Sequence, residues 1–137
     1  MEKKKAHLEM IQGVINRMSG NSFLIKGWAV TLVAGIFALS SKDADKLFFF
    51  VTYIPILLFW GLDSFYLLQE RLYRALYNKV RLQNEEEIDF SMKATQKDFP
   101  EDNCSFWDCV LSKTEIWFYF PLAILTAVII ILCVCCN

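Results

Sequence analysis

Residues 116–136 have the sequence IWFYFPLAILTAVIIILCVCC, which contains no charged side chain. A helix needs about 20 apolar residues to cross a hydrocarbon core of about 30 Å, so this stretch is long enough to span a membrane. Two further stretches have a similar length: residues 23–41, whose only charge is Lys26, and residues 47–68, whose only charge is Asp63. Since backbone groups in lipid must be paired internally, we expect all three to be helices.

The composition of the whole chain agrees with a membrane protein. It has 137 residues, 55% of them hydrophobic, and a net charge of −1, with nearly all the charge outside the three apolar stretches. The polar remainder is too short to bury the core of a large soluble catalytic domain. We therefore predict an all-α integral membrane protein: three transmembrane helices, an N-terminal amphipathic helix and a cytoplasmic extension of the second span.

This division predicts four segments along the chain. They are an amphipathic cytoplasmic helix (residues 1–20), a transmembrane hairpin (22–68), a cytoplasmic basic helix with an acidic loop (69–114) and a third transmembrane helix (115–137).

Apolar residues recur at three- and four-residue spacing before the first span, which indicates an amphipathic helix. They are Leu8, Ile11, Val14, Ile15 and Met18. We expect Gly20, Asn21 and Ser22 to end this helix. Its apolar face could lie on anionic lipid or pack on the rest of the cytoplasmic face, and the sequence leaves both open.

The distribution of lysine and arginine predicts the orientation, because basic residues are enriched on the cytoplasmic side. Four precede the first span and four follow the second: Lys3, Lys4, Lys5 and Arg17, then Arg71, Arg74, Lys79 and Arg81. We therefore expect the N-terminus and residues 69–113 to be cytoplasmic. The 42–46 loop and the C-terminal Asn137 would then lie outside.

Lys26 and Asp63 fall at nearly the same depth of the predicted hairpin. Lys26 lies eighteen residues before Ala44, at the centre of the turn, and Asp63 lies nineteen residues after it. Charges in membrane segments usually face protein or water, so this register predicts an ion pair, within one protomer or between neighbours. The alternative is that Lys26 extends to the headgroups and Asp63 marks the end of its span.

Small residues share one face of the first span and predict close helix packing, because they let helix backbones approach each other in lipid. They are Gly27, Thr31, Ala34, Gly35 and Ala38. The contact could be within the hairpin or between protomers. In the second span, Pro55 predicts a kink, because proline removes a helical hydrogen bond.

The helical pattern of the second span continues past residue 68 and becomes basic. Its four cations could bind an anion, such as the phosphate of a nucleotide, oligonucleotide or lipid: Arg71, Arg74, Lys79 and Arg81. Ordinary anchoring beside a span is the alternative. The following residues 85–102 are acidic, with seven carboxylates against two lysines.

The sequence lacks the motifs of an enzyme. His7 is the only histidine, and P-loop, GxGxxG, HExxH and GxSxG motifs are missing. A pair such as Cys104 and Cys109, without a nearby histidine, is weak as a zinc site. We predict no catalytic activity, no cofactor and no metal.

Three strings carry a resemblance to small bacterial multi-span membrane proteins of phage-defence operons. They are SFLIKGWAVTLVAGIFAL (22–39), LLFWGLDSFYLLQERLYRALYNKVR (57–81) and SKTEIWFYFPL (112–122). The chain most resembles the channel-like membrane effector of Hailong-type systems; CRISPR-accessory pore proteins are a second candidate, but their ribonuclease motif is missing. The first resemblance implies a homo-oligomer in the bacterial inner membrane, held inactive by a DNA oligomer from a nucleotidyltransferase. It would place that oligomer on the basic helix.

The sequence thus favours a homo-oligomeric effector that forms or gates an ion pathway and depolarises the membrane in anti-phage defence. Its control would come from an anionic ligand or a partner protein on the cytoplasmic face. The alternative is a non-conducting membrane adaptor that docks a cytoplasmic partner through residues 70–113.

Overall fold

A computed structural model describes residues 1–40, 45–100 and 104–136, and the regular structure in these ranges is all helical. The elements are α1 (Glu2–Leu39), α2 (Lys46–Phe50), α3 (Tyr53–Leu82), the short 3-10 helix η1 (Glu85–Glu87), α4 (Phe106–Val110) and α5 (Lys113–Cys135). Most of the predicted outer loop, the acidic residues Glu101 and Asp102, and Asn137 lie outside the described residues.

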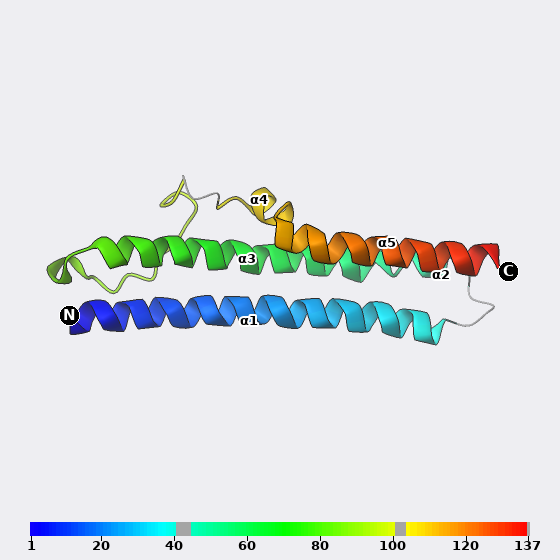
Figure 1. Ribbon diagram of the computed structural model, residues 1–137, viewed down its shortest axis with the longest axis horizontal. Coiled ribbons are helices and arrows are strands. Elements are labelled where there is room, and N and C mark those ends of the chain that lie inside the picture. Colours follow the sequence, from blue (N-terminus) through cyan, green and yellow to red (C-terminus); the bar gives the residue numbers. More distant parts are fainter. Residues whose placement is uncertain (41–44, 101–103, 137) are drawn as a thin grey trace.

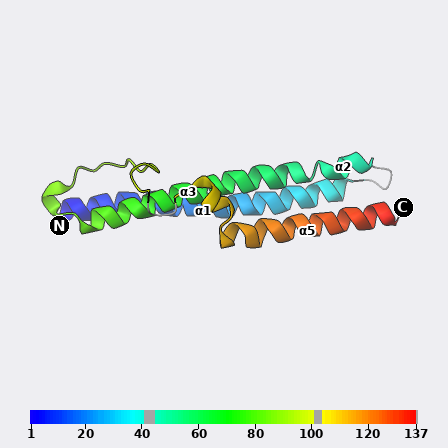
Figure 2. The same ribbon diagram turned by 90° about the horizontal axis from the view of Figure 1, so that it is seen from above.

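The molecule is a long, narrow bundle (Figure 1). Helices α1 and α3 run antiparallel and form the most extensive contact in the fold. Helix α5 lies beside the C-terminal half of α1 and the N-terminal half of α3 (Figure 2). One end of the bundle therefore has three long helices, and the other has two helices covered by residues 83–100.

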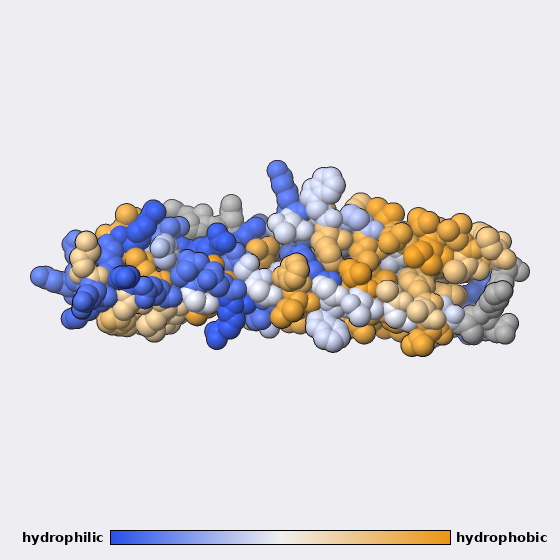
Figure 3. Space-filling view, turned by 60° about the horizontal axis from the view of Figure 1, so that its bottom comes forward, coloured by the Kyte–Doolittle hydropathy of each residue, from blue (hydrophilic) through white to orange (hydrophobic). Residues whose placement is uncertain are grey.

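The two ends differ sharply in polarity, as the hydropathy colouring of Figure 3 shows. We call the three-helix end the apolar half and the other end, which includes the N-terminus and residues 83–100, the polar half. Three helical segments are long and apolar enough to cross a membrane: α1, α2 with α3 (Lys46–Leu82), and α5. The all-α class is confirmed, and the three helices are compatible with a multi-pass membrane protein.

The predicted end of the N-terminal helix at Gly20, Asn21 and Ser22 is wrong, because α1 continues through all three. A glycine inside a helix costs about 1 kcal/mol relative to alanine, which tertiary packing readily offsets. Here Ile15 and Ile25 are buried on either side of the expected break. The N-terminal part of α1 packs on α3 through Ile11 and Ile15. Of the two arrangements that the sequence leaves open, this is packing on the rest of the polar half.

The second apolar stretch is interrupted near Pro55. The interruption lies about one turn before the proline, and not at the proline itself. Helix α2 ends at Phe50, and α3 begins at Tyr53 after a turn at Val51 and Thr52. The proline ring clashes with the carbonyl four residues before it, and its nitrogen has no hydrogen to donate. That carbonyl belongs to Val51, and it accepts a hydrogen bond from Ile54 N at 3.1 Å instead.

Each half has its own core. In the polar half, Ile11 and Ile15 of α1 pack against Leu68, Leu72 and Leu76 of α3. In the apolar half, the buried residues are Ala29, Val33, Ile56 and Tyr119, from three helices. The uninterrupted course of α3 from one core to the other is the helical extension predicted for the second span.

Candidate functional site

Three charged side chains from three helices meet inside the bundle, where α5 begins. They are Lys26 of α1, Asp63 of α3 and Glu115 of α5. Asp63 is fully buried, Glu115 is 1% exposed, and the Lys26 side chain is 16% exposed. We call these three residues the charged cluster. It occupies the boundary between the apolar and polar halves.

Lys26 joins the other two members of the cluster. Its ammonium group forms an ion pair with Asp63 and a second one with Glu115, with Nζ 3.2 Å from Oε1. It also donates to the Ser22 hydroxyl, one turn earlier on α1, at 3.0 Å. The same Nζ lies 5.8 Å from the centre of the Phe118 ring, a distance at which an aromatic face attracts a cation.

Asp63 accepts hydrogen bonds from three side chains, two of α1 and one of α5. Ser22 donates to Oδ1, while Lys26 and the Tyr119 hydroxyl donate to Oδ2, the latter at 3.0 Å. The Tyr119 ring stacks on Trp60, with ring centres 5.8 Å apart, and the Trp60 indole donates to the Val110 carbonyl at 3.2 Å. Several donors therefore compensate the burial of this carboxylate, as the burial of a charge requires.

Glu115 is less well compensated. It stands in the first turn of α5, where its backbone N donates to the Ser112 side chain at 3.4 Å. Its Oε1 contacts Lys26, but its buried Oε2 has no hydrogen-bond partner among the described residues. A single ammonium group thus faces two carboxylates.

The structure brings Lys26 and Asp63 together within one chain, at the common depth that counting from the turn predicts. Sequence reasoning missed Glu115. It directly precedes the third apolar stretch, and this position at the end of an apolar stretch is the signal that could have placed it near the other two charges. The pattern Ser112-Lys-Thr-Glu115 also resembles the start of a solvent-exposed helix, which conceals its burial.

The small-residue face of α1 does not make the contact between α1 and α3. Gly27, Thr31, Ala34 and Ala38 are exposed, and Gly35 is half-buried. A Cβ atom added at Gly27 or Gly35 would meet nothing within 4 Å. Helix α1 packs instead through its opposite face, at Ile25, Ala29 and Val33. Packing within the hairpin is thus wrong for this face, and packing between protomers stays a prediction.

The four basic residues of α3 do not share one set of neighbours. Arg74 is exposed and pairs with Glu70 one turn before it, at 2.7 Å. Arg71 is half-buried and acts electrostatically on Cys109 of α4. The pKa of Asp98 is lowered mainly by the hydrogen bond from Thr95, and the positive charge of Lys79 acts in the same direction. Arg81 is exposed.

Residues 83–100 contact the N-terminal part of α1 in the polar half. Glu85 accepts from the Met1 ammonium group at 2.7 Å and from Lys3 N at 2.8 Å. The bond with the ammonium group is the main reason why the pKa of Glu85 lies below its ordinary value of 4.5. Farther along, the buried His7 contacts the Ser91 carbonyl through Nε2 at 3.0 Å.

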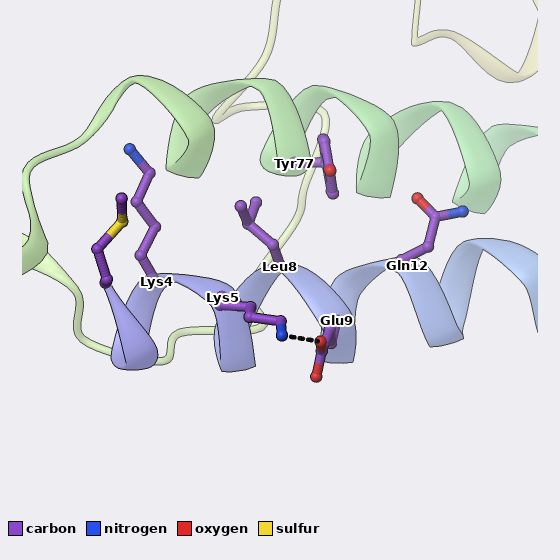
Figure 4. A pocket seen from close by; sticks show the side chains of 7 residues that line it. Lys4, Lys5, Leu8, Glu9, Gln12 and Tyr77 are labelled. Atoms are coloured by element: carbon purple, nitrogen blue, oxygen red, sulfur yellow. Dashed lines mark ion pairs between the residues drawn. The ribbon is translucent and has the colours of Figure 1, made fainter.

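A groove of about 410 Å³ lies between α1 and α3 near the N-terminus. Lys4, Leu8 and Gln12 rise from α1 toward α3, and Tyr77 comes from α3, while Lys5 forms an ion pair with Glu9 (Figure 4). A second groove of about 270 Å³ shares Gln12 and Tyr77 with the first, and Arg74 and Asn78 also line it. Cations and an aromatic ring thus follow one continuous seam.

No family model, no curated protein and no solved structure matches the chain. Within residues 1–40, 45–100 and 104–136, no group of three histidine, cysteine, aspartate or glutamate side chains could hold a metal ion.

Proposed function

We propose that the protein is a homo-oligomeric membrane effector whose assembled copies form or gate an ion pathway in the bacterial cell membrane. The observation that carries this proposal is the exposed small-residue face of α1, formed by Gly27, Thr31, Ala34 and Ala38. Helices in lipid gain little from hydrophobic burial against each other, so close approach at small residues drives their association.

A single copy has a filled interior in its apolar half. Ala29, Ile56 and Tyr119 are 0–1% exposed at the centre of the three helices. An ion pathway therefore requires several copies around a common axis. The small-residue face points away from this interior, and beside it lies a shallow groove of about 270 Å³ between Phe23, Trp28 and Thr31. A neighbouring helix could seat a side chain there.

Control would come from the polar half, which the distribution of lysine and arginine favours placing in the cytoplasm. The seam between α1 and α3 offers Lys4, Lys5 and Arg74 for phosphate groups and Tyr77 for stacking a base. We therefore place the anionic ligand, a nucleotide or oligonucleotide, along this seam. Of the four basic residues that the sequence suggests for the anion site, Arg74 is the one that lines this seam. The role in anti-phage defence rests on the resemblance to the Hailong-type effector.

The deciding experiment measures membrane potential and assembly together. Expression of the chain should depolarise cells in a potential-sensitive dye assay, and Gly27→Leu should abolish both depolarisation and the oligomer seen by mass in detergent. Gly13→Leu is the matched control, because a Cβ there also meets nothing within 4 Å but lies in the polar half. An unchanged potential with well-expressed protein would contradict the proposal.

A membrane adaptor is the second candidate, favoured by two exposed apolar side chains outside the long helices. Trp107 is 69% exposed and Leu111 is 66% exposed, and both lie within residues 70–113. A partner protein could bury them. A monomer in detergent that leaves the membrane potential unchanged would favour this function.

A further inference from the structure

The charged cluster has one carboxylate more than it has ammonium groups. Lys26 balances one negative charge, and Asp63 and Glu115 together would carry two. A net charge buried between apolar helices is costly unless it is paired. Either the cluster holds an additional cation or the fold bears an unpaired charge.

Charged and titratable groups from several helices surround Glu115, and together they decide whether a further cation can bind there. Helix α1 contributes Lys26, whose ammonium group also donates to Ser22, and α3 contributes Asp63. Within α5, Tyr119 donates its hydroxyl to Asp63. Helix α4 contributes Cys109, whose thiol is neutral because burial raises its pKa.

The next basic residue on α3, Arg71, is too far from Asp63 to pair with it. It lies eight residues along the helix, which is about 12 Å at 1.5 Å per residue. Among the described residues, Lys26 is the cation that forms ion pairs with both carboxylates.

The orphaned oxygen identifies the place. Oε2 of Glu115 is buried and has no hydrogen-bond partner among the described residues, although the other oxygen of the same carboxyl group contacts Lys26. An ammonium group this close repels a metal ion, whereas a proton can bind directly to a carboxylate oxygen. The start of α5 favours negative charge at Glu115, but a helix N-terminus compensates only part of the cost of a buried charge.

We propose that the charged cluster is a proton-binding site, at which one proton is held by the carboxyl groups of Glu115 and Asp63. With this proton the three side chains are electrically neutral. Loss of the proton leaves one negative charge where α5 packs on α1 and α3, and weakens the packing of α5 on these two helices. The site depends on the fold of one chain, so it can exist whether or not the assembled copies conduct ions.

Infrared spectroscopy of the full chain in detergent tests the proposal directly, because a protonated carboxyl group has a carbonyl band that a carboxylate lacks. We expect this band at neutral pH, together with its disappearance on alkaline titration. Glu115→Gln and Asp63→Asn should each remove it, since either change leaves one carboxylate for one ammonium group. Glu86→Gln, at an exposed glutamate, should retain it. Absence of the band from the unmodified protein at neutral pH would overturn the proposal.

Thermal unfolding provides a second measurement. The folded chain should hold a proton that an unfolded glutamate has released. The unfolding temperature should therefore fall as pH rises from the ordinary range of a glutamate, about 4.3, to the pH at which the infrared band disappears, and should level off above that pH. Glu115→Gln should flatten this dependence, and Glu86→Gln should leave it unchanged. Sodium chloride at constant pH should stabilise the protein no more than choline chloride. A specific sodium effect that Glu115→Gln abolishes would show that the cluster binds a metal cation, and would overturn the proposal.

Discussion

Lys26 and Glu115 are 89 residues apart in the sequence, yet their Nζ and Oε1 atoms lie 3.2 Å apart. This ion pair joins the first long helix to the last one, and the contact of Lys26 with Asp63 ties in α3. The charged cluster therefore fixes the level at which α5 starts on the surface of the α1–α3 pair. Its removal should affect the whole apolar half.

Lys26→Met should destabilise the protein strongly, because it removes the ammonium group that pairs with the buried carboxyl groups of Asp63 and Glu115. Removing one partner of a buried ion pair costs about 3–5 kcal/mol. We expect a loss of this order in the free energy of unfolding in detergent. Lys113→Met, at an exposed lysine near the start of α5, is the control and should cost less than about 0.5 kcal/mol. Equal losses in the two variants would mean that the cluster contributes little to stability.

Two alanines of α1 should respond in opposite ways to enlargement. Ala29 is fully buried against α3 and α5, so Ala29→Leu should cost about 1–3 kcal/mol through overpacking. Ala34 lies on the exposed small-residue face, so Ala34→Leu should leave the unfolding of one chain nearly unchanged. If a second copy packs on that face, Ala34→Leu should shift the mass in detergent toward the monomer. Retention of the oligomer by Ala34→Leu would exclude this face as the interface.

The long helices were predictable because membrane spans depend on apolar length, a property that local sequence carries. The Lys26–Asp63 contact followed from the same kind of count, since rise per residue converts sequence distance into depth. The break at Val51 and Thr52 was partly predictable: Pro55 indicates an interruption, but its ring acts on the preceding turn.

Other features depend on contacts between distant segments and could not be predicted from local pattern. Helical continuity through Gly20 is set by packing of α1 on α3, which overrides the low helix propensity of glycine. The small-residue face of α1 and its buried face at Ala29 and Val33 are both apolar, so periodicity alone does not show which of them contacts α3. The burial of Glu115 depends on where α5 packs.

His7→Leu should loosen residues 83–100 without disturbing the long helices. The substitution keeps an apolar volume beside Phe90 but removes the contact of Nε2 with the Ser91 carbonyl. A hydrogen bond of this kind contributes about 1 kcal/mol. Amide hydrogen exchange of residues 88–92 should therefore accelerate several-fold. Met10→Leu, at an exposed position of α1, is the control, and a similar acceleration there would show that the His7 contact is not responsible.

Acid should release the contact of Glu85 with the N-terminus. The pKa of Glu85 is lowered in the folded protein, mainly by the Met1 ammonium group, so this contact stabilises the fold above the ordinary value of 4.5. The stabilisation should be lost as pH falls below 4.5, through the lower pKa of the folded state. Pepsin, which is active in acid, should then cut near Leu82 and Phe90 more readily.

The comparison with Glu85→Gln separates this effect from the pH dependence of pepsin itself. Near pH 4.5 the variant should be cut faster than the unmodified protein, and the two rates should converge as the solution becomes more acidic. Glu86→Gln should behave like the unmodified protein, because Glu86 is an exposed neighbour in η1. Parallel rates for Glu85→Gln and the unmodified protein throughout would rule out a role for the Glu85 contact.

The cysteines provide a built-in test of the proposed orientation. Cys133, Cys135 and Cys136 are exposed at the far end of α5, whereas Cys104 and Cys109 are buried in the polar half, and burial raises the pKa of Cys109. Thiolates react with maleimides, so the two buried cysteines should react slowly. If the N-terminus is cytoplasmic and the chain crosses the membrane three times, an impermeant maleimide should modify the C-terminal cysteines from outside the inner membrane in spheroplasts.

The matched variant replaces Cys133, Cys135 and Cys136 with serine and should lose this modification, which mass spectrometry of the intact chain would detect. In inverted membrane vesicles, where the cytoplasmic face is outermost, the unmodified protein should react only slowly, through Cys104 and Cys109. Rapid modification of the C-terminal cysteines in the vesicles, but not in spheroplasts, would reverse the orientation. The seam between α1 and α3 would then face away from the cytoplasm, where it could not meet a cytoplasmic nucleotide.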